Sequence, residues 1–304
     1  MGHSEKEIWT DRGIRLFCLA FSGLAPTLCS KLLYYKAFGR KLDLKSPRTL
    51  NEKLMWLKLN TYRDNVLITQ CVDKYAVRSY IREQGCKEIL NDLIGVWDKP
   101  SEIPFPELPQ RFVLKCNHGC GYNIICQDKD LMDQQNVMCT LKKWLQEDFW
   151  RRYAEINYRH VPKKIICEAY IEDRQQKVPV DYKFYCFNGH AKYVMACAHR
   201  DEDYVKYYFF NRKWQLERIN PASVAAPPGF TLPKPARLEE MFAYADRLSA
   251  PFPFVRVDLY AADNRIIFGE LTFTPAAALD TNRLPETDQM FGGILEIPLN
   301  KESL

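Results

Sequence analysis

Residues 254–273 read FVRVDLYAADNRIIFGELTF, in which two alternating runs flank Ala-Asp-Asn-Arg. The period of two and the polar turn predict an antiparallel β-hairpin centred near residue 264. Arg256 and Asp258 then share one face of the first strand. Glu270, on the return strand, lies opposite or nearly opposite Asp258.

The predicted pairing brings two carboxylates together. Asp258 and Glu270 would lie about 4.5–5.5 Å apart at Cβ, where like charges destabilise a strand pair. A divalent cation removes this repulsion, and Mg²⁺ takes one or two protein carboxylates together with phosphate oxygens and water. Arg256 either meets an oxyanion or only neutralises the acids, in which case the three residues form a surface ion cluster.

A second motif lies upstream, where Val113-Leu114-Lys115 reads as a strand that ends before a turn with Gly119 and Gly121. Glycines let backbone N–H groups approach phosphate oxygens, and the lysine supplies positive charge. The spacing matches neither a P-loop nor a Rossmann fingerprint. A plain β-hairpin with a glycine turn is the alternative.

A third motif is the strand at residues 165–171, which ends in an acidic segment. Backbone groups at such an exit can pair with an adenine edge, and the Glu168 carboxylate can accept from an exocyclic amine. On the next strand Asp181 and Lys183 face the same way. Taken alone, this pattern also fits an ordinary sheet edge.

Composition and charge restrict the class of protein. The chain has 304 residues with 47% hydrophobic and 27% charged residues, which predicts a globular fold and excludes disordered, collagen-like and coiled-coil proteins. The net charge of +5 comes without a block of like charges, so no nucleic-acid partner is expected. The longest uncharged stretch, residues 16–30, contains Gly23 and Pro26 and is too short to span a bilayer. A helical core segment is expected there, with peripheral membrane contact as the alternative.

The eleven cysteines are odd in number and mostly lie in apolar runs, which favours buried thiols and a reducing cytoplasm. A zinc site at Cys116, His118, Cys120 and Cys126 lacks a second ligand pair at a suitable spacing. A cysteine nucleophile assisted by His190 or His199 has no local signature. Both stay open as minor alternatives.

The chain order predicts an α+β protein with three regions. Residues 1–100 are expected to be mainly helical, with helices over 10–40, 50–57 and 70–83. Four prolines between Lys99 and Pro109 mark a connector. Extended segments follow and form two sheet-containing lobes, at 101–175 and 176–304. Each lobe is expected to contain one further helix, over residues 131–153 in the first and 238–248 in the second.

The order of these motifs resembles the ATP-grasp fold, in which two α+β lobes hold ATP between them. The closer resemblance, over roughly residues 45–290, is to the TupA-like branch, named for teichuronopeptide synthesis. It rests on five segments that agree in order: Leu50-Asn51-Glu52-Lys53, Asp73-Lys74-Tyr75, residues 113–121, residues 181–189 and residues 256–275.

The resemblance implies a role for each matching position. Two of these positions depart from the wider pattern: Thr272 stands where many ATP-grasp enzymes have an asparagine ligand, and Ala276-Ala277-Ala278 replaces a glycine-rich stretch. The implied residues are Lys74, Lys115, His118, Gly119 and Gly121 at the phosphates, Glu168, Ala169 and Ile171 at adenine, Asp181 at the ribose, Asp258, Glu270 and Thr272 at Mg²⁺, and Arg256 and Lys183 in catalysis.

The resemblance further implies a cytoplasmic ligase that uses ATP and Mg²⁺ to join a carboxylate to an amine through an acyl phosphate. Its expected substrates are small molecules, an amino acid and a uronic-acid or amino-acid carboxylate, in the synthesis of a cell-surface polysaccharide or peptide. A kinase or glycosyltransferase-like enzyme of polysaccharide assembly is one alternative. A nucleotide-binding module without catalysis is another.

Overall fold

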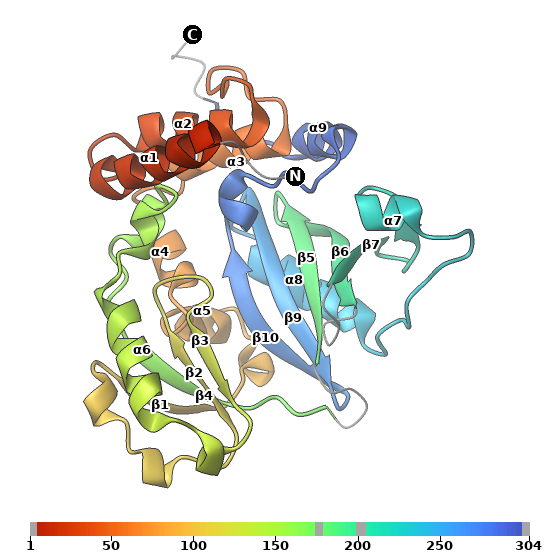
Figure 1. Ribbon diagram of the computed structural model, residues 1–304. Coiled ribbons are helices and arrows are strands. Elements are labelled where there is room, and N and C mark those ends of the chain that lie inside the picture. Colours follow the sequence, from red (N-terminus) through yellow and green to blue (C-terminus); the bar gives the residue numbers. More distant parts are fainter. Residues whose placement is uncertain (1–4, 174–178, 199–204, 300–304) are drawn as a thin grey trace.

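The computed structural model describes residues 5–173, 179–198 and 205–299. Two antiparallel sheets, each with helices packed against it, lie beside each other below a layer of N-terminal helices (Figure 1). This architecture confirms the predicted α+β class. Of the helices described, none combines the length and the apolar character needed to cross a membrane.

In the described residues before Leu93 the chain forms only helices and turns. Leu50 begins a helix because the Thr49 side chain accepts the Glu52 N–H, while the Glu52 carboxylate accepts the Thr49 N–H. The helices are α1 (Glu5–Phe21), α2 (Pro26–Phe38), α3 (Leu50–Leu59), α4 (Val66–Val72), α5 (Val77–Glu83) and the 3-10 turn η1 (Lys87–Ile89).

The helical character predicted for residues 10–40 is confirmed as two helices, α1 and α2, of which the second starts at Pro26. The helix predicted over 70–83 is broken, and this prediction is corrected. The range 70–83 divides at Asp73, whose carboxylate accepts the N–H groups of Tyr75 and Ala76 in place of helical hydrogen bonds.

The first sheet has four strands in the order β1-β4-β2-β3. Its strand β1 lies ahead of residue 101, in the region expected to be mainly helical. The helix predicted over 131–153 is shorter. Phe149 and Trp150 are both buried, and the chain leaves the helix before them and turns toward the protein interior. The elements are β1 (Leu93–Trp97), η2 (Pro100–Glu102), η3 (Phe105–Glu107), β2 (Phe112–Cys116), β3 (Asn123–Cys126), η4 (Lys129–Leu131), α6 (Gln134–Gln146), η5 (Phe149–Arg151), η6 (Ile156–Tyr158) and β4 (Ile165–Ala169).

The second sheet has six strands in the order β10-β9-β5-β6-β7-β8. The Asn188-Gly189 hairpin and the helix predicted over 238–248 are both confirmed. The elements are β5 (Val180–Phe187), β6 (His190–Ala198), β7 (Lys206–Asn211), β8 (Leu216–Glu217), α7 (Pro221–Ala225), α8 (Leu238–Ser249), β9 (Phe254–Ala262), β10 (Arg265–Thr272), η7 (Pro275–Ala278) and α9 (Pro285–Ile294).

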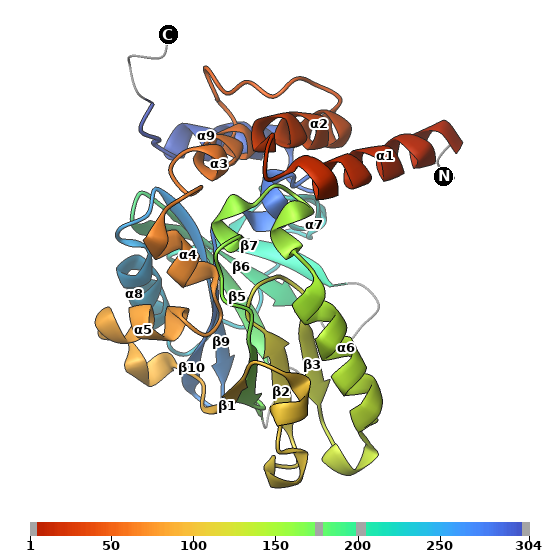
Figure 2. The same ribbon diagram turned by 90° about the vertical axis from the view of Figure 1, so that its left-hand side faces the viewer.

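Strand alternation gives the second sheet an apolar face toward α8 and a second face, which we call the polar face, on which a charged cluster lies beside buried aromatic residues. Phe184 packs on Phe242 of α8, so the residues in phase with it form the core beneath that helix. Register places Lys183 beside Asp258 and Tyr185 beside Arg256 on the other face. Figure 2 shows α6 on the outer side of the first sheet, and α3 beside α9 above both sheets.

Candidate active site

The β9–β10 hairpin places Asp258 opposite Glu270, as the sequence predicts. Its turn pairs Ala262 with Arg265, a register that would carry on to set Asp258 opposite Gly269. A bulge at Gly269 shifts the pairing by one residue. A Cβ at this glycine would lie 3.0 Å from the Asp258 carbonyl oxygen, so the bulge favours glycine.

The Arg256 guanidinium lies between the two carboxylates. Its Nε and Nη2 each donate to Asp258 at 2.7 Å, and Nη2 also donates to Glu270 Oε1 at 3.2 Å. Thr272 Oγ1 accepts from Arg256 and donates to Glu270, both at 3.1 Å. An arginine therefore relieves the predicted repulsion, which is the neutralising role that the sequence left open.

Lys183 adds a second cation to this cluster. Its Nζ lies 2.7 Å from Asp258 Oδ2 and 2.5 Å from Asp181 Oδ2. Burial would lower the pKa of Lys183, but attraction to these carboxylates raises it. Asp181 Oδ1 is buried without a hydrogen-bond partner among the described residues. With Glu270, three carboxylates face two cations, which leaves the cluster with excess negative charge.

The donor set fits a magnesium ion. Glu270 has a side chain that is 37% exposed, and its Oε2 makes no hydrogen bond to a described residue. The described part of the chain holds no group of three or more His, Cys, Asp or Glu side chains that could bind a metal. Mg²⁺ needs only one or two protein carboxylates when phosphate supplies the other oxygens.

The loop between β2 and β3 is shaped by its glycines. A Cβ at Gly119 would lie 2.8 Å from ring atoms of both Phe149 and Tyr122, so a larger residue would displace the loop. Gly121 has a φ of +77°, which glycine adopts without strain. The sequence therefore needs glycine at both predicted positions.

Asn117 and Lys74 hold this loop in place. Asn117 Nδ2 donates to Asp73 and to the Pro162 carbonyl, both at 2.8 Å. Lys74 donates from its N–H to the Asn117 carbonyl at 3.2 Å, and from its Nζ to the Gly119 carbonyl.

Lys74 also acts on the hairpin of the other sheet. Burial would raise the pKa of Glu270, but the positive charges of Lys74, Arg256 and Lys183 together lower it. The glycine loop, through Lys74, and the carboxylate cluster are therefore electrostatically coupled.

His118, predicted to contact the nucleotide, is a buried support for the loop. Its Nε2 lies 3.1 Å from the Trp144 carbonyl oxygen on α6, and its ring packs on Tyr122. Burial lowers the pKa of His118 to about 4, which keeps the imidazole neutral near pH 7. This side chain faces α6, and a contact with the nucleotide stays a prediction.

Lys115 and Glu168, predicted at the phosphates and at adenine, form an ion pair. Lys115 Nζ lies 2.5 Å from Glu168 Oε2, and Arg78 Nη1 lies 3.3 Å from Oε1. One carboxylate therefore meets two cations, which leaves excess positive charge at this end of the site.

The strand exit predicted to hold adenine is ordered by the segment before β1. The Ala169 N–H donates to the Asp92 carbonyl at 3.0 Å, and Asn91 Nδ2 donates to the Ala169 carbonyl at 2.7 Å. Within the described ranges, no hydrogen bond involves the backbone of Ile171. Of the two predicted backbone contacts, Ile171 is thus the more open to a ligand.

A pocket of about 210 Å³ opens beside the carboxylate cluster on the polar face of the second sheet. Arg256 belongs to both, because it binds Asp258 and also lines the pocket. Aromatic side chains form much of the wall, and polar groups come from the segment after β10. The lining residues are Tyr185, Met195, Tyr207, Phe209, Ile219, Asn220, Arg256, Pro275, Ala276, Asp280, Asn282, Arg283 and Thr287.

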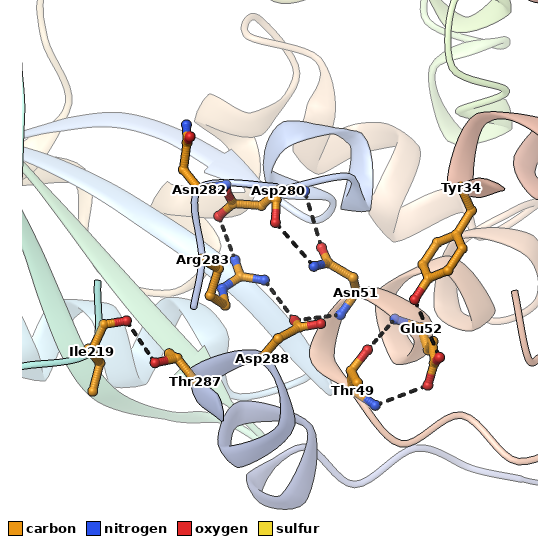
Figure 3. Close-up of polar contacts among 10 residues, drawn as sticks. All are labelled: Tyr34, Thr49, Asn51, Glu52, Ile219, Asp280, Asn282, Arg283, Thr287 and Asp288. Atoms are coloured by element: carbon orange, nitrogen blue, oxygen red, sulfur yellow. Dashed lines mark hydrogen bonds and ion pairs between the residues drawn. The ribbon is translucent and has the colours of Figure 1, made fainter. Parts of the chain in front are cut away.

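Buried Arg283 ties the rim of this pocket to the N-terminal helices (Figure 3). It donates to Asp280 at 2.9 Å and to Asp288 at 3.1 Å. Asn51 of α3 donates from its N–H to Asp288 at 3.1 Å and from Nδ2 to the Asp280 carbonyl at 3.4 Å. The helical region therefore supports the pocket directly.

The three alanines of the rim, residues 276–278, have φ values of 50°, 57° and 61°. Side chains raise the energy of this left-handed region, and surrounding contacts must offset that cost. Next to them, Thr274 donates to buried Glu155 at 2.5 Å. Lys58 of α3 is buried near Glu155, and burial lowers its pKa to about 8. Lys58 Nζ donates to the Tyr153 carbonyl at 2.9 Å, so α3 also contacts the segment that carries Glu155.

Several of these residues were missed in the sequence. Asn117, just before a glycine turn, carried a usable signal because asparagine often stabilises turns. The Asp280-x-x-Arg283 spacing is typical of a local ion pair. Nothing in the sequence pointed to Arg78, which meets Glu168 only through tertiary contact.

The cysteine alternatives gain no support from the described residues. Cys116 and Cys126 are buried, and burial raises the pKa of both thiols. Neither joins Cys120 or His118 in a group able to hold a metal within the described ranges. His199 lies outside these ranges.

No curated protein matches the sequence significantly. Among solved structures, D-alanine–D-alanine ligase from Bacillus anthracis in complex with ATP is 17% identical with a TM-score of 0.46, over 74% of this chain and 62% of that one. The ligase from Helicobacter pylori is 12% identical (TM-score 0.43, 84% and 69% covered), and a D-cycloserine synthetase is 13% identical (TM-score 0.43, 81% and 79% covered).

The chain spans less than two thirds of the Bacillus ligase. A family model, TupA-like ATP-grasp, matches residues 52–296, which hold the glycine loop, the strand β4 and the carboxylate hairpin. The chain therefore belongs to the TupA-like ATP-grasp family.

Proposed function

We propose that this protein is an ATP-dependent ligase that joins a carboxylate to an amine. The observation that carries the proposal is the double position of Arg256, which binds Asp258 and Glu270 and also lines the adjacent pocket. From there one guanidinium can contact a phosphoryl group on one side and a substrate carboxylate on the other.

The nucleotide would lie between the two charge clusters. Lys74 and Lys115, with the N–H groups of the Gly119–Gly121 loop, would bind its phosphates, since this end of the site has excess positive charge. The Ile171 backbone would meet adenine, and Asp181, which has an unpaired buried oxygen, would accept a ribose hydroxyl.

Asp258, Glu270 and Thr272 would hold Mg²⁺, which neutralises phosphate charge when bound. Lys183 holds Asp258 in place, because its Nζ bridges Asp258 and Asp181. Burial raises the pKa of Asp258, and attraction to Arg256 and Lys183 opposes that rise. Arg256 is fixed by two hydrogen bonds to Asp258, so it needs no reorganisation to meet charge that develops in the transition state.

In the proposed reaction a substrate carboxylate oxygen attacks the γ-phosphorus of ATP, and the bond to the bridging oxygen of ADP breaks. The resulting acyl phosphate is attacked at carbon by an amine, which loses a proton as the amide forms and phosphate leaves. Closure of the two lobes would keep water from the acyl phosphate.

The pocket beside Arg256 supports a proposal for the substrate class. Its volume of about 210 Å³ accommodates one small unit, such as an amino acid or a uronic acid, with the carboxylate at Arg256. Aromatic walls and polar rim groups suit a sugar ring or a small side chain. We also propose, on the basis of the family match and not of the pocket, that the reaction belongs to the synthesis of a cell-surface polysaccharide or peptide in the cytoplasm.

Isotope transfer tests the reaction type. With ATP, Mg²⁺, an amine and a candidate carboxylate labelled with ¹⁸O, a ligase moves one labelled oxygen into inorganic phosphate and forms an amide, both visible by mass spectrometry. Without amine, hydroxylamine should trap the acyl phosphate as a hydroxamate. Glu270→Gln should abolish both signals, and Glu240→Gln, on the exposed face of α8, should leave them unchanged.

The same assay separates the alternatives. A kinase gives a stable phosphorylated product without hydroxamate, a glycosyltransferase consumes a sugar nucleotide in place of ATP, and a binding module turns over nothing. Any of these results, obtained across a panel of amino acids and uronates, would contradict the proposed ligase activity.

A further inference from the structure

The helices α1 and α2 form an exposed apolar and basic surface at one end of the molecule. In both views they lie at the end opposite β1 (Figures 1 and 2). Leu24, in the turn between them, is 85% exposed, and Leu16 is 59% exposed. We define the outer surface as Arg12, Arg15, Leu16, Leu19, Leu24, Leu28, Lys31 and Tyr35.

Helical spacing gathers these residues on one side of each helix. On α1, Arg12, Arg15, Leu16 and Leu19 occupy positions i, i+3, i+4 and i+7 of one helix side, and all four are exposed. The opposite side of α1 packs inward through buried Cys18.

On α2 the same arrangement recurs. Leu28, Lys31 and Tyr35 follow Leu24 at spacings of three or four, and all are exposed. Cys29 and Leu33 face the core instead. The outward side of both helices thus carries apolar side chains next to basic ones.

Charge identifies the partner of the outer surface. Residues 12–42 contain six Lys or Arg residues and no Asp or Glu. Nearby Asp148 is balanced by Arg151 and Lys163, and Arg151 also donates to the Leu19 carbonyl. Asp11 and Asp43 lie directly outside residues 12–42. An apolar stripe whose charged neighbours within residues 12–42 are all cations is complementary to an anionic bilayer, where leucines enter the acyl boundary and cations meet lipid phosphates.

We propose that the outer surface docks the protein on anionic lipid bilayers as a peripheral, reversible contact. The attachment places α1 and α2 flat on the lipid, and the pocket is linked to this layer through α3 and Asn51. The inference is independent of the proposed reaction, because no residue of the outer surface lies in the candidate active site.

Vesicle sedimentation of the full chain tests the proposal. Vesicles of phosphatidylcholine with 30% phosphatidylglycerol should bind the chain at low salt, and pure phosphatidylcholine should bind it at least ten-fold less. The triple variant Arg12→Gln/Arg15→Gln/Lys31→Gln should bind the anionic vesicles about 100-fold more weakly, because each lost charge weakens binding about five-fold. Leu24→Asp with Leu28→Asp should weaken it at least ten-fold.

Two matched controls keep the test specific. The first control changes three exposed lysines outside the outer surface to Gln together: Lys142, Lys213 and Lys234. It removes the same number of positive charges. Leu131→Asp alters a leucine that is 84% exposed at the other end of the molecule. Both controls should bind as the parent does, and far-ultraviolet circular dichroism should show every variant folded. Salt at 0.5 M should release the unmodified chain, which gives a readout without any substitution.

Three results would overturn the proposal. The chain could fail to bind the anionic vesicles, it could bind both compositions equally, or the control variants could lose binding as strongly as the surface variants. A dimer in analytical ultracentrifugation that dissociates in Leu24→Asp/Leu28→Asp, without vesicle binding by the parent, would instead assign the outer surface to a second copy of the chain.

Discussion

The two charge clusters of the site are built with opposite balance. In the four-stranded sheet one carboxylate, Glu168, meets two cations, Lys115 and Arg78. In the six-stranded sheet three carboxylates share two cations, and Arg256 bridges Asp258 to Glu270. The first cluster suits an anion and the second suits a cation, so the pair is complementary to a metal-bound polyphosphate.

The difference also bears on stability. Glu168 would keep one partner if Lys115 were lost. Lys183 is shared by Asp181 and Asp258, both of which are buried, so its loss would leave Asp258 with Arg256 and Asp181 without a cationic partner among the described residues. Removal of one partner from a buried ion pair is costly, whereas a pair with a second partner is less affected.

The largest expected effect compares Lys183→Met with Lys115→Met. The first should lower the free energy of unfolding by about 3–5 kcal/mol, and the second by about 1 kcal/mol or less. Lys115→Met should still raise the KM for ATP about ten-fold, because a phosphate contact is lost. Urea unfolding measures the free energy of unfolding, and initial rates measure the KM for ATP. An equal loss of stability in the two variants would contradict the inferred difference in charge balance between the two clusters.

Arg256→Lys tests the bridging role next. A lysine cannot make the two-pronged contact with Asp258, so kcat should fall about 100- to 1,000-fold. Asp258 keeps Lys183 as a partner, so the fold should remain. Arg237→Lys, whose partner Glu240 is exposed, is the matched control. A loss of less than ten-fold in kcat would show that Arg256 only neutralises Asp258 and Glu270 and does not act in the reaction.

Gly119→Ala tests the close packing of the glycine loop. The new Cβ would meet Phe149 and Tyr122 at 2.8 Å, so stability should fall by about 1–3 kcal/mol. Gly293→Ala, near the end of α9, meets nothing within 4 Å and should be neutral or slightly stabilising. Thermal unfolding distinguishes the two, and an unchanged Gly119→Ala melting temperature would show that the loop has room to shift.

The smallest effect concerns pH. The pKa of His118 is lowered to about 4 in the folded state, so the unfolded state binds more protons between its ordinary value of 6.5 and 4. Stability from this group is therefore present above pH 6.5 and decreases as pH falls. The loss from pH 7.5 to 5.5 should be about 1.3 kcal/mol. Denaturant unfolding of His118→Gln should show a flatter dependence, and an identical slope would argue against a buried neutral imidazole.

Local signals explain which parts of the fold were predictable. The helix start at Leu50 was visible because Thr49 and Glu52 lie close in sequence. The break at Asp73 was not visible in the sequence. The Asp73 carboxylate accepts hydrogen bonds from the Tyr75 N–H and from Asn117, which lies after β2 in the four-stranded sheet. The strand β1 was missed because its pairing partner, β4, lies about 70 residues later.

The amino-acid sequence alone determined the class of fold, the two carboxylates on one hairpin face and the lysine with its glycine turn, because alternation and turn chemistry act between neighbouring residues. The tertiary structure decided what those groups meet: the bulge at Gly269 that sets the register, the guanidinium of Arg256 between the acids, and the tie from Asn51 to the pocket rim. Such contacts join residues far apart in the chain, and only packing of the whole molecule selects them.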